Sequence, residues 1–262
     1  MKSVVLITGA SSGIGAALAK VFAAHANDHG HDLALVARRA DRLEALADEI
    51  AATGRPRPTV FTADLERRDA ASAIAAELSS RGLEPAIVVN NAGFGLIGAA
   101  TGLSRDEQLA MIDVNVRALT ELSLMFVDSL ARHRGGILNV ASLAAFLPGP
   151  GMAVYYASKA YVLSFSEALH RELADRGVRV TALCPGPVPT EFQARAGVKA
   201  DKYPRMLGLS PQRVAEEGYE ALKAGTRVVV PGVANKAIAN LVPMLPRRLV
   251  LDMTNARNRA RV

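Results

Sequence analysis

Short apolar runs alternate along the chain with longer segments in which apolar residues recur every three or four positions. The runs are mostly continuous rather than alternating, which is typical of strands buried on both faces of a parallel sheet. They lie at Ser3–Thr8, Asp32–Ala37, Thr59–Ala63, Ala86–Asn90, Gly136–Ala141, Val178–Cys184 and Arg227–Val230. Leu43, Leu46, Ala47 and Ile50 show the helical spacing found between the runs. Regular alternation of strand and helix predicts one α/β domain with a doubly wound parallel sheet covered by helices on both faces.

A glycine-rich segment follows the first predicted strand and begins the first predicted helix, Thr8-Gly9-Ala10-Ser11-Ser12-Gly13-Ile14-Gly15. Glycines allow a tight turn and let backbone N–H groups approach a pyrophosphate at the helix N-terminus. The order G-x-x-x-G-x-G differs from the commoner G-x-G-x-x-G, and an ordinary strand–helix turn is the alternative. Its place at the first β–α junction favours dinucleotide binding, with contacts expected from Gly9, Ser11, Ser12, Gly13, Ile14 and Gly15.

The end of the second predicted strand indicates which dinucleotide is bound. An acidic residue there would hold the free ribose hydroxyls of NAD and repel a 2′-phosphate. The chain instead has Ala37 followed by Arg38 and Arg39, and a guanidinium offers paired donors to a phosphate. We therefore expect NADP(H) as the cofactor, bound by both arginines. The alternative is that the two arginines are only a solvated cap on a strand end.

A tyrosine and a lysine four positions apart lie in the helix predicted after the fifth strand, in Tyr155-Tyr156-Ala157-Ser158-Lys159. One helical turn places Tyr155 and Lys159 on the same face. A nearby ammonium group favours the phenolate and lowers the pKa of a phenol from about 10, which suits a general acid/base. Ser142, at the carboxyl end of the fifth strand, supplies a hydroxyl that can donate to a substrate carbonyl. A Tyr-x-x-x-Lys pair on the surface face of a helix, without chemistry, is the alternative.

The chain resembles the short-chain dehydrogenases/reductases from end to end except in its basic tail. The matching motifs, in the family's order and spacing, are Thr8–Gly15, Asn90-Asn91-Ala92-Gly93, Asn115, Ser142, Tyr155-x-x-x-Lys159, and Pro185-Gly186 with Thr190. The resemblance implies a single-domain Rossmann fold with a seven-stranded parallel sheet in the order 3-2-1-4-5-6-7. It also implies metal-free interconversion of a carbonyl and an alcohol by a homodimer or homotetramer. The Val-Ala-Arg-Arg stretch resembles a bacterial subgroup of NADP-dependent oxidoreductases.

The resemblance also implies a role for each matching residue. Tyr155 would exchange a proton with the substrate oxygen, Lys159 would also hold the nicotinamide ribose, and Ser142 would orient the carbonyl. Asn115 would complete the catalytic set by supporting a water that links the lysine to bulk solvent. The other implied cofactor contacts are Asp64 and Leu65 at the adenine, Asn91, Ala92 and Gly93 beside its ribose, and Pro185, Gly186, Val188 and Thr190 at the nicotinamide.

Apolar residues dominate the segments beside the predicted nicotinamide site. Besides Ser142, the expected substrate contacts are Phe94, Phe146, Met152 and Phe192. They predict a substrate whose non-reacting part is hydrophobic, and the expected NADP(H) preference favours carbonyl reduction. The alternative is that several of them are ordinary core residues. A Pro- and Gly-rich stretch at about residues 187–210 is expected to form a flexible substrate loop.

The positive charge is concentrated at the end of the chain. We expect residues 1–234 to form the NADP-binding catalytic domain and residues 235–262 to form a basic amphipathic extension. The net charge of +6 is carried mainly by this extension, through Lys236, Arg247, Arg248, Arg257, Arg259 and Arg261 against Asp252. Because the remainder is close to neutral, we expect no nucleic-acid partner. The extension either packs on a folded surface or contacts an anionic membrane surface.

Several classes of protein are excluded by composition. The single cysteine, Cys184, excludes a disulfide scaffold and a cysteine-built zinc site. No apolar segment is long enough to span a membrane and no signal peptide precedes the first strand, so a cytoplasmic location is expected. His25, His29 and His31 suggest a metal site, but the run follows a predicted helix and we expect no metal. Two rival functions remain: an NAD(P)H-binding regulator without turnover, and a peripheral membrane reductase of lipid carbonyls.

Overall fold

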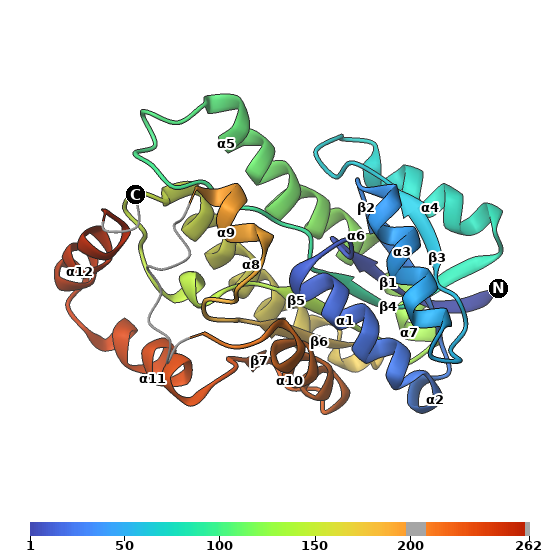
Figure 1. Ribbon diagram of the computed structural model, residues 1–262. Helices are drawn as coiled ribbons and strands as arrows, with labels where there is room; N and C mark the ends of the chain where they lie inside the picture. Colours follow the sequence, from blue (N-terminus) through green and yellow to red (C-terminus); the bar gives the residue numbers. More distant parts are fainter. Residues whose placement is uncertain (198–207, 260–262) are drawn as a thin grey trace.

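Seven strands form one parallel sheet in the computed structural model, which describes residues 1–197 and 208–259 (Figure 1). The sheet order is β3-β2-β1-β4-β5-β6-β7, and the expected fold and strand order are therefore confirmed. Part of the expected substrate loop (198–207) and Arg261 lie outside the described residues. The strands are β1 (Lys2–Thr8), β2 (Asp32–Ala37), β3 (Thr59–Thr62), β4 (Leu83–Asn90), β5 (Gly136–Val140), β6 (Arg179–Leu183) and β7 (Val228–Val229).

Most strand ends lie within one residue of the expectation, and the start of β4 differs most. The predicted strand at Ala86–Asn90 begins earlier, at Leu83, although Pro85 lacks the N–H that a ladder needs. The register between β1 and β4 shifts at this point, with Val4 opposite Pro85 and Val5 opposite Ile87. This irregularity accommodates the proline inside the sheet. The last strand, β7, is shorter than the predicted Arg227–Val230 because it pairs with β6 only at Val228 and Val229.

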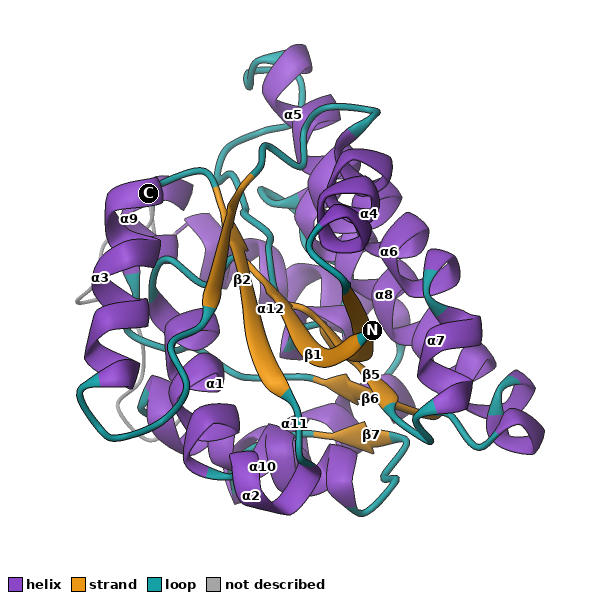
Figure 2. Cartoon of the chain, turned by 90° about the vertical axis from the view of Figure 1, so that its right-hand side faces the viewer, coloured by secondary structure: helices purple, strands orange, loops and turns teal. Residues whose placement is uncertain are grey.

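Two layers of helices cover the sheet, as Figure 2 shows. Val5 and Ile7 of β1 pack in one apolar cluster and Val4 and Leu6 in another, because successive side chains point to opposite faces. All four are fully buried, which explains the continuous apolar run in the sequence. One layer is formed by α1 (Gly13–Ala24), α3 (Ala40–Ala51) and α10 (Pro211–Lys223), and the other by α4 (Ala70–Ser80), α5 (Arg105–Ile112), α6 (Leu119–Met125), α7 (Val127–Arg132) and α8 (Ala153–Glu172).

The C-terminal extension packs on the rest of the chain. It consists mainly of α11 (Val233–Leu241) and α12 (Arg247–Arg259), with a short 3-10 turn at Val242–Met244 between them. Ala239 of α11 is buried in an apolar cluster with residues of β6 and α8 and with Ala141, which follows β5. Because α11 begins at Val233, the expected division after residue 234 falls inside a helix. The remaining helices are α2 (Ala26–His29) and α9 (Glu191–Ala196).

Helix lengths bear on membrane insertion. Within residues 1–197 and 208–259, no helix combines the length and apolar character that crossing a bilayer requires.

Candidate active site

A cavity of about 520 Å³ lies at the carboxyl ends of the strands. In open parallel sheets this edge is where ligands bind, beside the point at which the strand order reverses between β1 and β4. Most of the expected cofactor and catalytic residues line this one cavity, namely Gly9, Ser11, Ser12, Gly13, Ile14, Arg38, Arg39, Asp64, Leu65, Asn91, Ala92, Gly93, Ser142, Tyr155, Lys159, Pro185, Gly186, Val188 and Thr190. Of the described residues expected here, Gly15, Asn115 and Phe146 are not part of its wall.

The glycine-rich loop forms a cradle that only glycine permits. Gly9 and Gly13 have φ of +65° and +58°, in the region that disfavours other residues. At Gly15 a Cβ atom would lie 2.2 Å from the carbonyl oxygen of Gly9, so any side chain there would break the turn. Gly15 therefore shapes the loop from behind the cavity. Helix α1 begins directly after Ser12, and its N-terminus faces the cavity.

Asn91 holds the loop after β4 against the glycine-rich loop. Its Nδ2 donates to the carbonyl oxygens of Thr8 and Gly9, at 2.9 and 3.1 Å. The Thr8 hydroxyl in turn accepts from the backbone N–H groups of Asn91 and Ala92. These bonds fix two neighbouring walls of the cavity relative to each other.

The two arginines after β2 lie beside the cradle and are paired with acids. The Arg39 guanidinium donates to the hydroxyls of Ser11 and Ser12, at 3.1 and 3.0 Å, and forms a 2.8 Å ion pair with Glu191. That contact holds the pKa of the Glu191 carboxyl below its usual range. Arg38 forms a 2.8 Å ion pair with Glu66. A cluster of paired guanidinium and carboxylate groups thus adjoins the position where α1 begins.

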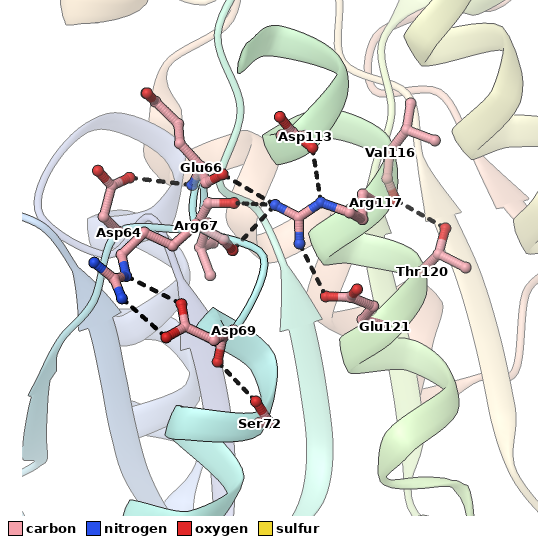
Figure 3. A network of polar contacts seen from close by, with 11 residues as sticks. Asp64, Glu66, Arg67, Asp69, Ser72, Asp113, Val116, Arg117, Thr120 and Glu121 are labelled. Atoms are coloured by element: carbon pink, nitrogen blue, oxygen red, sulfur yellow. Dashed lines mark hydrogen bonds and ion pairs between the residues drawn. The ribbon is translucent and has the colours of Figure 1, made fainter. Parts of the chain in front are cut away.

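A network of polar contacts around Arg117 holds the loop after β3 in place (Figure 3). The sequence alone did not predict this network. Arg117 donates to the backbone carbonyls of Glu66 and Arg67, both at 3.0 Å. The same guanidinium pairs with Asp113 at 2.7 Å and with Glu121 at 3.2 Å. Arg117 therefore anchors the segment that begins with the expected adenine contacts. Its only sequence signal is the acid–Arg–acid spacing of four residues on a helix, which is also common on solvated faces.

Asn115 lies on the same element, a single π-helical segment at Asp113–Ala118. Its Nδ2 donates to the carbonyl oxygen of Phe94 and to the hydroxyl of Ser158, both at 3.0 Å. Its Oδ1 accepts from the Phe94 N–H at 3.1 Å. A Cβ at Gly93 would lie 2.9 Å from Asn115 Oδ1 and 3.4 Å from Lys159 Nζ. Asn115 is thus a buried neighbour of the cavity wall, and π-helical turns often occur at such sites.

Lys159 is buried at the centre of this arrangement. Its side chain extends from α8 and its Nζ donates to the carbonyl oxygen of Val140, at the end of β5, at 2.8 Å. Burial disfavours the charged form and lowers the pKa of Lys159 to about 8. A group with that pKa is mostly protonated at pH 7. The cavity therefore has a positive charge one helical turn from Tyr155.

Ser142 follows β5 directly and caps the 3-10 turn at Leu143–Phe146 by accepting from the Ala144 N–H at 3.1 Å. Its hydroxyl hydrogen stays free of that bond, because the oxygen is the acceptor. Ser142, Tyr155 and Lys159 all lie on the wall of the same cavity. The groups available for chemistry there are a hydroxyl, a phenol and an ammonium group on the wall of one cavity.

The wall next to these groups is apolar. Phe94 and Met152 line it and are each 4% exposed, and the Phe192 ring lies 5.4 Å from that of Tyr155. Phe146 was expected to line it too, but the 3-10 turn directs it into the apolar clusters around Leu143 and Leu147, so its expected substrate contact is not supported. Sequence reasoning also missed Glu191 and Arg195 of α9 and Arg257 of α12, all on the wall.

The side chains of His25 and His31 contact different residues. The ring of His25 stacks on Tyr219 at 4.5 Å, and His31 forms a 2.8 Å hydrogen bond with Ser3. Of His29 only the backbone is described. Across the described parts of the chain, no group of three or more His, Cys, Asp or Glu side chains is arranged to hold a metal ion.

Comparison with known proteins agrees with this geometry. The model of the short chain dehydrogenase family matches residues 3–200. Sulfoacetaldehyde reductase 2 of Chromohalobacter salexigens is 40% identical over 200 residues, which covers 73% of this chain and 75% of the relative.

Two solved structures share the fold over most of the chain. A short-chain dehydrogenase from Sphingobium yanoikuyae in complex with NADPH is 32% identical with a TM-score of 0.80, covering 90% of each chain. A 3-ketoacyl-(acyl-carrier-protein) reductase from Brucella melitensis complexed with NADH is 30% identical with a TM-score of 0.74, covering 88% of this chain and 96% of the other. The chain belongs to the short-chain dehydrogenase/reductase family of oxidoreductases, which use a nicotinamide cofactor.

Proposed function

We propose that the protein is an NADP(H)-dependent reductase that converts a carbonyl group on a largely hydrophobic substrate into an alcohol. The observation that carries the proposal is the meeting of Ser142, Tyr155 and the buried Lys159 on one wall of the cavity. The cradle of Gly9 and Gly13 fits a dinucleotide, because it leaves backbone N–H groups exposed at the N-terminus of α1. When bound, NADPH supplies the hydride that reduces the carbonyl carbon.

Tyr155 is the proposed general acid. It gives its phenolic proton to the carbonyl oxygen as negative charge develops there, and Ser142 donates a hydrogen bond to the same oxygen. The ammonium of Lys159 stabilises the phenolate that Tyr155 leaves behind. Asn115 is a positioning residue, since it holds the Phe94 loop through two hydrogen bonds and contacts α8 through Ser158. Replacement of the proton on Tyr155 completes the cycle.

The preference for NADP(H) rests on Arg38 and Arg39. Both line the cavity beside the cradle, where Arg39 already binds the hydroxyls of Ser11 and Ser12. A 2′-phosphate at this position would gain bidentate, charge-assisted hydrogen bonds. Two of the acids near these arginines, Glu66 and Glu191, are paired with them and are therefore partly neutralised. The NADPH complex of the Sphingobium relative supports this choice, whereas the NADH complex of the Brucella relative shows that the family uses both.

Substrate class follows from the apolar wall formed by Phe94, Met152 and Phe192. Such a wall favours an alkyl or aryl group next to the carbonyl. Reduction of an aldehyde is the reaction named for the Chromohalobacter relative, which supports reduction as the direction here.

We also propose that the protein forms a homodimer or homotetramer. Apolar side chains on α5, α6 and α8 are exposed, and an apolar patch on a surface often marks an interface with a partner. They are Leu109, Ile112, Leu124, Met125 and Tyr161. A second copy of the same helices would bury them symmetrically.

Peripheral membrane contact is a second candidate, favoured by the surface between α11 and α12. Leu241 and Met244 are 61% and 81% exposed there, next to the basic residues Arg247 and Arg248. The full chain and a Leu241→Glu/Met244→Glu variant should be sedimented with vesicles containing phosphatidylserine. Binding lost in the variant would support membrane contact, and equal pelleting of the two proteins would remove it. The cytoplasmic location stays a prediction.

The proposed function is tested by titrating the protein with NADPH and NADH, followed by an aldehyde and ketone panel at saturating cofactor. We expect tighter binding of NADPH and consumption of NADPH with aryl or alkyl carbonyls. Equal or tighter binding of NADH would overturn the cofactor choice. Binding without turnover of any carbonyl would favour a regulator instead.

A further inference from the structure

Helix α9 begins directly against the glycine-rich loop. Thr190 caps the helix by accepting from the Phe192 N–H at 3.4 Å, and a Cβ atom at Gly13 would lie 3.0 Å from Thr190 Cγ2. Phe192, the second residue of the helix, lies with its ring 5.4 Å from that of Tyr155 on the cavity wall. One short helix therefore borders both the dinucleotide cradle and the expected substrate wall.

The carboxylate of Glu191, the first residue of α9, lies among groups that suit an anion. It forms an ion pair with Arg39 at 2.8 Å and a longer one with Arg42 at 4.0 Å. The same Arg39 guanidinium donates to the hydroxyls of Ser11 and Ser12. Hydrogen bonds from Arg39 and, to a smaller extent, from the Ser12 hydroxyl lower the pKa of the Glu191 carboxyl. The carboxylate thus occupies the surroundings in which the proposed 2′-phosphate would be bound.

The other end of α9 is held by separate contacts. The Arg195 guanidinium lies 3.6 Å from the carboxylate of Glu66, and its central carbon lies 3.9 Å from the centre of the Phe94 ring. Loss of the ion pair at the start of the helix would therefore release the first turn of α9 and leave the last turn in place. Because Phe192 belongs to that first turn, the position of its ring on the cavity wall depends on the ion pair.

We propose that Glu191 is a specificity residue whose carboxylate occupies the 2′-phosphate position and is displaced by the phosphate of NADP(H). A phosphate monoester carries roughly two negative charges at pH 7 and accepts bidentate hydrogen bonds from a guanidinium, so it takes Arg39 from Glu191. The first turn of α9 is then released, and Phe192 moves with it. NAD(H) lacks this phosphate and leaves the ion pair intact, so the two cofactors give the chain different substrate walls. The inference rests on the proposed function, since it concerns the cofactor and substrate of the same cavity.

The test uses adenosine 2′,5′-bisphosphate and AMP, which differ only in the 2′-phosphate, each at a saturating concentration. Amide hydrogen exchange followed by mass spectrometry reports how firmly residues 188–197 are held. We expect the bisphosphate to speed exchange in this segment roughly two- to fivefold relative to AMP, the range for loss of one exposed ion pair. In Glu191→Gln the two nucleotides should give equal exchange. Glu44→Gln is the matched control, because Glu44 is also 51% exposed and paired with an arginine but lies on α3, outside the cavity wall, and it should match the unchanged protein.

Calorimetric titration of the same two nucleotides separates failure of the inference from failure of the proposed function. The bisphosphate should bind more tightly than AMP, and Glu191→Gln should raise the affinity for the bisphosphate roughly two- to fivefold while leaving that for AMP unchanged. Tighter binding of the bisphosphate with equal exchange for both nucleotides would overturn the inference and leave the NADP(H) preference standing. A difference in exchange that persists in Glu191→Gln would overturn it as well. Equal affinities for the two nucleotides would remove the NADP(H) preference itself, and with it the displacement of Glu191.

Discussion

The buried charge of Lys159 predicts how the stability of the protein changes with pH. Its pKa is lowered to about 8 by burial, whereas an unfolded lysine has a pKa of about 10.4. Between these values the unfolded chain holds a proton that the folded chain has lost, so the free energy of unfolding rises with pH. A difference of this size corresponds to roughly 3 kcal/mol, because one pKa unit is worth about 1.4 kcal/mol. The stabilisation is complete above pH 10.4 and is lost as the pH falls to about 8.

Lys159→Met removes the titrating group and keeps a side chain of similar length. Urea unfolding of the cofactor-free proteins, followed by circular dichroism, gives the free energy of unfolding at pH 7, 8, 9 and 10. The difference between the unchanged protein and Lys159→Met should rise by roughly 2–3 kcal/mol from pH 7 to pH 10, in favour of the unchanged protein. The same substitution at the exposed Lys236, Lys236→Met, serves as a control. The difference between the unchanged protein and this variant should not rise in the same way. Parallel profiles for the unchanged protein and Lys159→Met would mean that burial does not lower the pKa of the lysine.

Three further predictions concern the cofactor and the assembly. Arg39→Ala should weaken NADPH binding roughly ten- to hundredfold in a fluorescence titration and leave NADH binding unchanged, since only NADPH offers a 2′-phosphate; equal losses for both would contradict this. Glu191→Gln should strengthen NADPH binding by about two- to fivefold, because it releases Arg39 from a 2.8 Å ion pair that is largely exposed; weaker binding would show that Glu191 helps to orient Arg39. Leu124→Glu, at a position that is 51% exposed, should lower the assembly mass in sedimentation velocity; an unchanged mass would place the interface elsewhere.

The fold was predictable from the sequence because its strands are buried on both faces. Runs such as Val4–Ile7 need apolar residues at every position, and this pattern distinguishes a sheet covered on both sides from a sheet with one face in solvent. The prediction was wrong at Pro85, where a residue that usually ends a strand lies inside β4. The register shift beside Val4 that accommodates it depends on two strands together. Local sequence carries no signal for that adjustment.

The candidate site was predictable where its functional residues lie close together in the sequence. The glycine-rich loop and the Tyr155–Lys159 pair are fixed by the geometry of one turn or one helix. Arg117 and Arg257 were missed because each reaches the site from a distant element, through contacts that only tertiary packing creates. Phe146 was expected to line the cavity from its position in the chain. It ends a 3-10 turn whose direction is set by packing around Leu147, and the sequence does not show that direction.

The role of Tyr155 as the acid of a carbonyl reduction can be tested by one substitution. Tyr155→Phe removes the hydroxyl and keeps the ring that packs against Phe192. We expect kcat for an accepted aldehyde to fall roughly 10²- to 10⁴-fold, the usual contribution of general acid catalysis, while NADPH binding changes less than about twofold. Turnover that survives undiminished in Tyr155→Phe would show that the proton comes from another group in the cavity.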